Sequence, residues 1–245
     1  MGMFDPKKRK LMTAIIAVIL VLAMVVPTVI SLLMEGKKEM RLGKEAMEAL
    51  QAQICGLLKP GNELVVAGAI ALEGTRLIAE QKYEPLRAHF SEGFLREARN
   101  LRELYGTADE VTTREENSAV WRAAKKAGAT ALYAMGEGGF LSALWKMAEA
   151  SQVGLEMDFA KVPVRQETIE ICEIFDINPY KLNAKGAILI GVPAGEALVQ
   201  ELHRMGRMAA VIGQTNAGND RMLYYNGNGR YLERPGKDEI YKVLP

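Results

Sequence analysis

Residues 136 to 182 read GEGGFLSALWKMAEASQVGLEMDFAKVPVRQETIEICEIFDINPYKL. A glycine turn precedes the helical pattern FLSALWKMAEAS, which is followed by the short strand VGLEMDF and the helix RQETIEICEIF. Strand and helix patterns also alternate on both sides of this stretch, with apolar strand-like runs at 63–72, 129–135, 187–192 and 208–215. This alternation predicts a single α/β domain.

Local signals delimit further elements of this domain. Ser91 is a favourable N-cap for the helical segment SEGFLREARNLREL, and Gly128 is a favourable stop for TREENSAVWRAAKKAG. The segment RMLYYNGNGRYLE has two alternating runs around Asn226 to Gly229, a composition that is typical of a tight β-hairpin. The segment from Glu63 to the last residues therefore contains strands, helices and turns without a low-complexity linker.

The composition excludes several classes of function. The 245 residues contain 31 basic and 30 acidic side chains, so the formal net charge is +1 and no overall field attracts nucleic acid. Cys55 and Cys172 are far apart in the sequence, and only His89 and His203 are available to join them. This spacing argues against a disulfide framework and against a zinc site, and Cys172 is expected to be a buried small hydrophobic residue.

An uncharged segment near the start predicts a membrane anchor. It runs from Leu11 to Met34 as LMTAIIAVILVLAMVVPTVISLLM, after a basic tail at residues 1–10. As a helix it would be roughly 36 Å long, enough to cross a hydrocarbon core of about 30 Å. Pro27 is tolerated in a membrane helix as a kink, and the run is too long for a cleaved signal peptide. We therefore expect a single-pass protein of the cell membrane, with the lipid bilayer as one partner.

The charges on the two sides of this segment do not fix its orientation. Lys7 to Lys10 precede it, and four cations follow it at Lys37, Lys38, Arg41 and Lys44, which is a tie by the positive-inside count. Moving four adjacent cations across the bilayer is the less favourable event. That cost favours a cytoplasmic N-terminus and an extracytoplasmic domain.

Residues 35–60 have the pattern of a juxtamembrane amphipathic helix. Met40, Met47 and Ile54 are seven apart, and Leu50 and Leu57 take the intervening positions. Two interpretations stay open, a short dimerising coiled coil and a helix that lies on the domain. The sequence KPGN then ends the helix, so the soluble domain is expected to span 61–245.

The turn formed by Gly136, Glu137, Gly138 and Gly139 is the most suggestive candidate site. Exposed amides at a helix N-terminus bind anions, although a tight turn that needs glycine for close packing is the plainer interpretation. The segment NAGNDR offers a second candidate, in which glycine amides and Arg221 would bind a phosphate. A lead-in to the following hairpin explains the same residues.

The stretch quoted at the outset resembles the C-terminal domain of the AIR synthase-related superfamily, which includes aminoimidazole ribonucleotide synthase and hydrogenase maturation factors. The resemblance rests on the glycine pair at the helix start, the ALW helix, the segment EAS followed by VG, the segment Pro163 to Arg165, and the Asn178–Pro179 pair. It extends less sharply from Asn62 to the last residues. It implies an α+β sandwich, preceded here by one transmembrane helix and the juxtamembrane helix.

The resemblance also exposes departures from the family pattern. Family members are two-domain ATP-utilising proteins whose N-terminal domain binds nucleotide and magnesium, and no such motif occurs in this sequence. The family's DxTxGG pattern aligns with residues 134–139, where Ala134 and Gly136 replace the aspartate and the threonine. Lys185 stands where the family has an acidic residue, and the last residues, YKVLP, lack the reactive cysteine of hydrogenase maturation factors.

These features favour a non-catalytic binding or assembly module without cofactor or metal. The expected partner is a second copy or another protein, bound on the face that the family's N-terminal domain would cover. The alternative is half of an ATP-dependent enzyme, completed in trans by a separate domain that would supply ATP and magnesium. A ligand-sensing domain is a third possibility, without a ligand to name.

Overall fold

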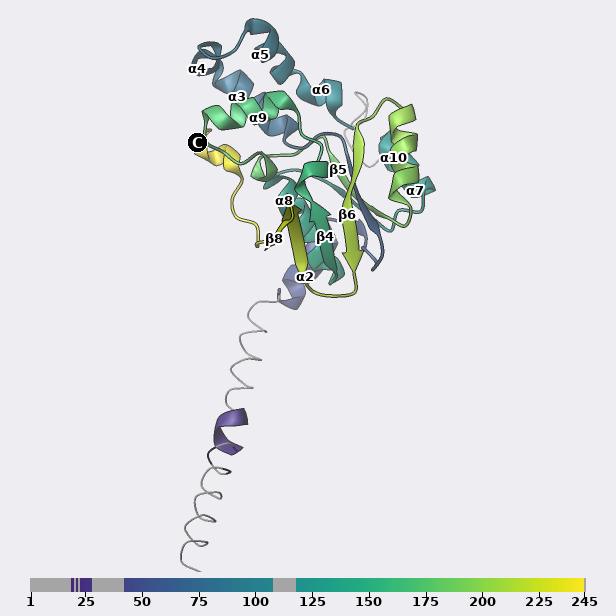
Figure 1. Ribbon diagram of the computed structural model, residues 1–245. Coiled ribbons are helices and arrows are strands. Elements are labelled where there is room, and N and C mark those ends of the chain that lie inside the picture. The colour runs from purple at the N-terminus through teal and green to yellow at the C-terminus, as the bar shows by residue number, and fades with distance from the viewer. Residues whose placement is uncertain (1–18, 20, 22, 28–41, 108–117, 245) are drawn as a thin grey trace, which may run out of the picture. The chain divides into compact units, whose positions relative to one another are not determined.

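The computed structural model describes residues 19, 21, 23–27, 42–107 and 118–244 (Figure 1). The chain divides into two compact units, Met1–Glu48 and Ala49–Pro245. In the first unit, residues 19, 21 and 23–27 are helical and exposed. None of the helices in the described ranges has the length and apolar character that crossing a bilayer requires. Most of the predicted anchor at 11–34 lies outside the described residues.

The juxtamembrane segment differs from the predicted helix over 35–60. Helix α2 covers only Lys44–Gln51, and Cys55–Gly56 form the short strand β1. Leu50, Ile54 and Leu58 are buried, so these side chains pack within the chain and are not available to a coiled-coil seam. The prediction of a continuous helix up to residue 59 is therefore wrong, because the chain leaves the helix after Gln51, and Leu50 and Ile54 of the heptad pattern are used by the core of the domain, whereas Leu57 is exposed.

The described part of the domain is built on a mixed sheet of eight strands in the order β1-β3-β5-β2-β6-β4-β7-β8. Only β4 and β7 pair in parallel, and every other pair is antiparallel. The alternation of strands and helices was correctly predicted, but consecutive strands of the chain are mostly not neighbours. The strands are β2 (Glu63–Ala67), β3 (Ala131–Ala134), β4 (Gly154–Asp158), β5 (Ile188–Val192), β6 (Ala209–Asn216), β7 (Arg221–Tyr225) and β8 (Asn228–Tyr231).

The helices begin and end close to the signals in the sequence. The Ser91 hydroxyl accepts a hydrogen bond from the Phe94 amide at 3.3 Å, and Ser118 caps the next long helix in the same way. The α-helices are α3 (Leu72–Gln81), α4 (Tyr83–Arg87), α5 (Glu92–Arg99), α6 (Leu101–Tyr105), α7 (Ala119–Lys126), α8 (Gly139–Ser151), α9 (Gln166–Ile174) and α10 (Gly195–Arg204). Three short 3₁₀ segments are η2 (Phe159–Lys161), η3 (Pro179–Lys181) and η4 (Glu239–Lys242).

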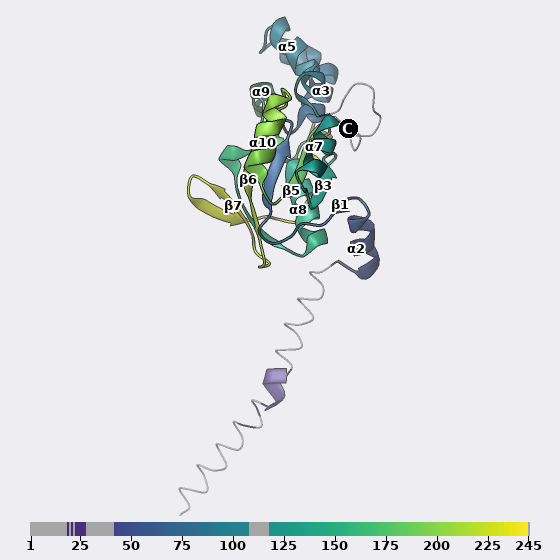
Figure 2. The same cartoon turned by 90° about the vertical axis from the view of Figure 1, so that its right-hand side faces the viewer.

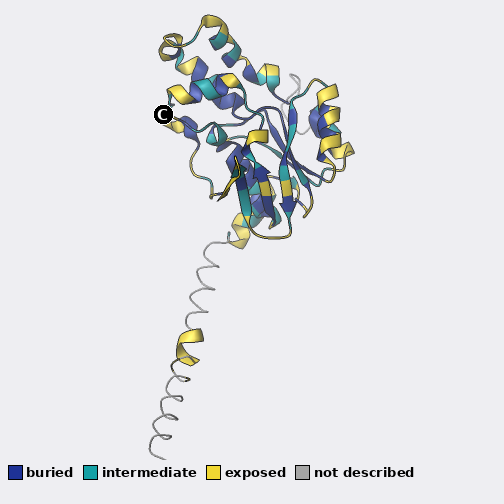
Figure 3. Cartoon of the chain, viewed as in Figure 1, coloured by how far each residue is buried: buried dark blue, intermediate teal, exposed yellow. Residues whose placement is uncertain are grey.

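Two apolar clusters hold the domain together. In the first, α7 and α10 cover one face of the central strands, and Val65, Ile190 and Leu202 are fully buried between them (Figure 2). In the second, α3, α4, α5 and α9 pack together with the segment around Ile240. Figure 3 shows the resulting pattern, in which the central strands β2 and β5 are largely buried and the outer faces of α7 and α10 are exposed. The first cluster thus joins a helical layer to the sheet, whereas the second contains no strand residue and joins helices to one another.

Two local predictions are confirmed by the geometry. Asn226 and Gly227 both have positive φ, at 49° and 79°, as a two-residue turn between β7 and β8 requires. Cys172 in α9 is only 2% exposed, and burial raises the pKa of its thiol to about 12. Cys172 is therefore a buried apolar residue, with no role as a nucleophile at neutral pH.

Candidate functional site

The glycine turn at residues 136–139 connects β3 to the N-terminus of α8. Gly138 and Gly139 both have left-handed backbones, with φ of 82° and 73°. A Cβ atom on Gly139 would lie 2.7 Å from the carbonyl carbon of Lys181 and 2.8 Å from the Leu182 nitrogen. Glycine is thus needed here both for the backbone conformation and for the close approach of η3. The geometry agrees with the plainer of the two interpretations of this turn.

The amide at the centre of the turn already has a partner inside the chain. Asp238, which is 3% exposed, accepts hydrogen bonds from the amides of Gly138 at 2.7 Å, Asn183 at 3.2 Å and Ile240 at 2.9 Å. Its carboxylate therefore occupies the place that an external anion would take at the start of α8. An anion that bound to the Gly138 amide would have to displace Asp238.

The electrostatics of Asp238 reflect its burial. Burial raises the pKa of its carboxyl group above the usual value, and the three backbone hydrogen bonds counteract this increase only in part. Glu137 of the same turn is exposed and accepts a hydrogen bond from the Tyr241 hydroxyl at 2.9 Å, which raises the pKa of that phenol. Two contacts thus join the turn to the C-terminal segment around η4, from Gly138 to Asp238 and from Glu137 to Tyr241.

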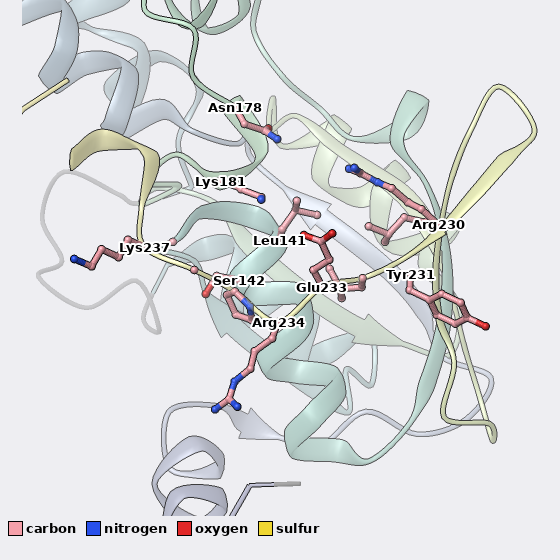
Figure 4. Close-up of a pocket in the computed structure, with 14 residues that line it drawn as sticks. Leu141, Ser142, Asn178, Lys181, Arg230, Tyr231, Glu233, Arg234 and Lys237 are labelled. Atoms are coloured by element: carbon pink, nitrogen blue, oxygen red, sulfur yellow. The ribbon is translucent and has the colours of Figure 1, made fainter. Parts of the chain in front are cut away.

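A small cavity of about 60 Å³ lies beside the turn, and we call it the basic cavity. Gly138 and Ser142 of α8 line one side, and the cations Lys181, Arg230, Arg234 and Lys237 come from η3, β8 and the segment after β8. In Figure 4, Lys181 and Glu233 point towards Leu141, whereas Arg234, Lys237 and Tyr231 point away from it. Sequence analysis missed these residues, because they come from separate parts of the chain and belong to no motif.

Neither of the two weaker candidates, Lys185 and Arg221, lines the basic cavity, although the amide of Ala184, next to Lys185, donates to the carbonyl of Gly136 in the turn at 3.0 Å. Lys185 is exposed, and its charge contributes to the lowered pKa of Glu73, for which the hydrogen bond from Arg76 is the main cause. Arg221 forms an ion pair with Glu149 at 2.7 Å, and both side chains are mostly buried. Arg221 is therefore engaged in the packing of β7 against α8.

The other features of the NAGNDR segment are local. The Asn216 side chain accepts a hydrogen bond from the Gly218 amide at 2.8 Å, which tightens the loop between β6 and β7. Within the described ranges, no group of three or more His, Cys, Asp and Glu side chains is placed to hold a metal ion. With this local hydrogen bond, the segment forms the loop between β6 and β7 and leads into the β7–β8 hairpin, which agrees with the second interpretation.

Exposed apolar side chains are few in the described part of the domain. The aliphatic ones, Leu57, Leu104 and Ile174, lie in three different parts of the chain. By contrast, Tyr225 and Tyr231 are 58% and 64% exposed and belong to a single hairpin, formed by β7 and β8. Tyr241 in η4 is also 53% exposed, so the hairpin holds two of the three exposed tyrosines in the described part of the chain.

Comparison with known proteins supports the resemblance seen in the sequence. The model of the family described as AIR synthase related protein, C-terminal domain, matches residues 59–226. Carbamoyl dehydratase HypE of Rhodobacter capsulatus is 27% identical over 113 residues, which are 43% of this chain and 33% of that protein. A hydrogenase expression/formation protein of Methanocaldococcus jannaschii is 31% identical over 112 residues, with the same two coverages. The chain thus spans about a third of the length of these relatives.

The fold matches as well. The solved structure of a HypE–HypF complex superimposes with a TM-score of 0.54 at 18% sequence identity, and the match covers 73% of this chain and 54% of the other. At this identity the likeness concerns the fold alone. The mixed sheet with its helical layers is therefore that of the expected family, and the resemblance inferred from residues 136–182 is confirmed.

Proposed function

The chain belongs to the AIR synthase related family by its C-terminal domain, and we propose that it is a non-catalytic module that binds another protein. The observation that carries this proposal is the hydrogen bond from the Gly138 amide to Asp238. An amide that serves a buried carboxylate of the same chain is not free to bind a phosphate. Ala134 and Gly136, at the family's aspartate and threonine positions, offer no side-chain oxygen to a metal or a substrate.

A protein partner also agrees with what is known of a structural relative. HypE has been solved in complex with HypF, so this fold takes part in a protein assembly in at least one case. For the present chain, we propose a protein partner of this kind, either a second copy or another protein.

The proposal predicts that the purified full-length chain has no ATPase activity. In detergent micelles with Mg–ATP, we expect phosphate release at the rate of the protein-free blank, because the Gly138 amide, which would hold the γ-phosphate, already donates to Asp238. In native membranes, chemical crosslinking is expected to give an adduct of defined mass with one protein partner. Turnover by the chain alone at about 1 s⁻¹ or faster, which is an ordinary enzymatic rate, would contradict the proposal.

A second candidate function is half of an ATP-dependent enzyme that is completed in trans. It is favoured by Lys181, which points into the basic cavity beside Gly138 at the start of α8 and would attract a phosphate. In this case ATP turnover would appear only after a separate nucleotide-binding domain is added. It would also require Asp238 to leave the Gly138 amide, so the variant Asp238→Ala would bind nucleotide more tightly than the unmodified chain.

We propose further that residues 11–34 anchor the chain in the cell membrane, on the basis of their uncharged sequence. The full-length protein is expected to stay in the membrane pellet after alkaline carbonate extraction. Val21→Arg should release part of it, because an arginine near the centre of a membrane helix costs about 3 kcal/mol. Ile174→Arg, at an exposed position of α9, is the control and should remain in the pellet. Equal extraction of both variants would contradict the anchor. Protease treatment of intact cells tests the proposed side of the membrane, and an extracytoplasmic domain is expected to be cleaved.

A further inference from the structure

Strand β8 forms one edge of the sheet and pairs only with β7. The amide of Leu232 donates to the carbonyl of Arg221 at 2.8 Å, which fixes the phase of the antiparallel ladder. Hydrogen-bonded and non-hydrogen-bonded pairs alternate from there, so the backbone groups of Gly229 and Tyr231 face away from β7. All four residues of β8 are exposed. The strand thus offers a free edge to which another strand can pair.

A groove with aromatic walls lies against this edge, and we call it the aromatic groove. Its volume is about 530 Å³, and Phe159, Tyr180, Tyr225 and Arg230 are among the residues that line it. The rings of Phe159 and Tyr180 pack edge to face with centroids 4.8 Å apart, and the Arg230 guanidinium lies 5.0 Å from the Phe159 ring centroid. The groove is large enough for one apolar side chain of a bound strand.

Arg230 on β8 and Lys181 in η3 lie beside this edge without carboxylate partners among the described residues. Lys181, Arg230, Arg234 and Lys237 line the basic cavity, which shares Arg230 with the aromatic groove. Among the described residues, none of these four cations lies within ion-pair distance of a carboxylate, whereas Arg76, Arg165 and Arg221 of the same domain all have acidic partners. Glu233 is the only acidic residue that lines either cavity. The edge of β8 is therefore electrostatically suited to a negatively charged ligand.

We propose that β8 binds an extended, acidic segment of a partner protein by strand addition. The backbone of the segment would pair with Gly229 and Tyr231, an apolar side chain would enter the aromatic groove, and carboxylates would meet Arg230 and Lys181. The free backbone edge favours a peptide over a lipid headgroup or a nucleic acid, since neither of these can continue a sheet. This inference rests on the proposed function, because it names the surface and the chemistry of the protein partner.

Fluorescence anisotropy with labelled peptides tests the proposal on the full-length protein in detergent micelles. The probe is a ten-residue peptide that alternates glutamate and valine around a central tyrosine. One comparison peptide has lysine in place of glutamate, and another has an N-methyl group on every backbone amide, so that neither of its edges can donate hydrogen bonds. The acidic probe is expected to bind saturably, and each comparison peptide at least about tenfold more weakly, because it lacks either the charge or the backbone donors.

Variants of the chain localise the binding. Arg230→Glu is expected to weaken binding of the acidic probe about tenfold. Lys126→Glu, the same charge reversal at an exposed position of α7, should leave it unchanged. Tyr231→Pro removes one outward N–H donor of the edge and should also weaken binding. Far-UV circular dichroism of each variant verifies its fold, and Arg230→Glu alone decides the outcome if Tyr231→Pro does not fold.

Several results would overturn the proposal. Equal binding of the acidic and basic probes, or equal affinity of the Arg230→Glu and Lys126→Glu variants for the acidic probe, would exclude the edge of β8 as the binding site of an acidic segment. Undiminished binding of the N-methylated probe would exclude strand addition. If Arg230→Glu instead dissolves an oligomer seen by light scattering, the occupant is a second copy. If the acidic probe does not bind but crosslinking still gives the adduct with a protein partner, the β8 surface is rejected and the proposed function stands. If the chain alone turns over ATP while the acidic probe still binds, the proposed function is rejected and the β8 surface stands.

Discussion

Replacing Gly139 by alanine is expected to destabilise the domain by about 4 kcal/mol, from the combined costs of a left-handed non-glycine backbone and of overpacking. The φ of Gly139 is 73°, and its missing Cβ would lie 2.7–2.8 Å from backbone atoms of Lys181 and Leu182. Those backbone atoms belong to the segment that η3 holds against α8, so they cannot move aside as a flexible side chain would. Urea unfolding followed by tryptophan fluorescence measures the change.

Gly206 provides the matched control for this prediction. Its φ is 70°, but a Cβ placed on it would have no neighbour within 4 Å. Gly206→Ala therefore carries only the backbone cost, about 1 kcal/mol. If the two variants lost the same free energy of unfolding, the close contact between the glycine turn and η3 would not be as tight as described.

Replacing Asp238 by alanine is expected to cost about 3 kcal/mol of stability, because three backbone amides lose their shared acceptor in a buried place. Glu233→Ala is the control. Glu233 is an exposed acidic residue of the same C-terminal segment, and its removal should change the free energy of unfolding by less than about 0.5 kcal/mol. A loss of similar size in both variants would mean that the amides of Gly138, Asn183 and Ile240 do not depend on Asp238.

The pH dependence of this difference follows from the raised pKa of Asp238. A carboxyl group whose pKa is higher in the folded state binds its proton more tightly there than in the unfolded state. The stability advantage of the unmodified chain over Asp238→Ala is therefore largest below the ordinary pKa of 3.8 and decreases as the pH rises through the raised value. An advantage that grows with pH would show that the three hydrogen bonds outweigh burial.

Elements with strong local signals were predictable from the sequence. The helix from Gly139 to Ser151, the capped start at Ser91 and the turn at Asn226–Gly227 each depend on residues within a few positions of one another. The end of α2 was not predictable in this way. The heptad spacing of Leu50 and Ile54 suits a coiled coil as well as a short helix that packs on the domain, and only the tertiary contacts distinguish the two.

The partners of charged residues were not predictable, because they are distant in sequence. Arg221 and Glu149 form one ion pair across α8 and β7, and no local signal in the sequence connects them. Asp238 caps η4 through the local bond to Ile240, which its position before Glu239 suggests. Its bond to Gly138, 100 residues away, has no local signal. The family resemblance identified the glycine turn, but it could not reveal that the Gly138 amide donates to a carboxylate of the same chain, Asp238.

The order of strands in the sheet has a consequence for biosynthesis. The central strand β2 is made early, but its two neighbours, β5 and β6, are made much later and end at Val192 and Asn216. During translation β2 therefore leaves the ribosome as an apolar segment with both edges unpaired, and pairing of distant segments is slow. We expect the nascent chain to need a chaperone until Asn216 has emerged, and the domain to fold afterwards in one cooperative step.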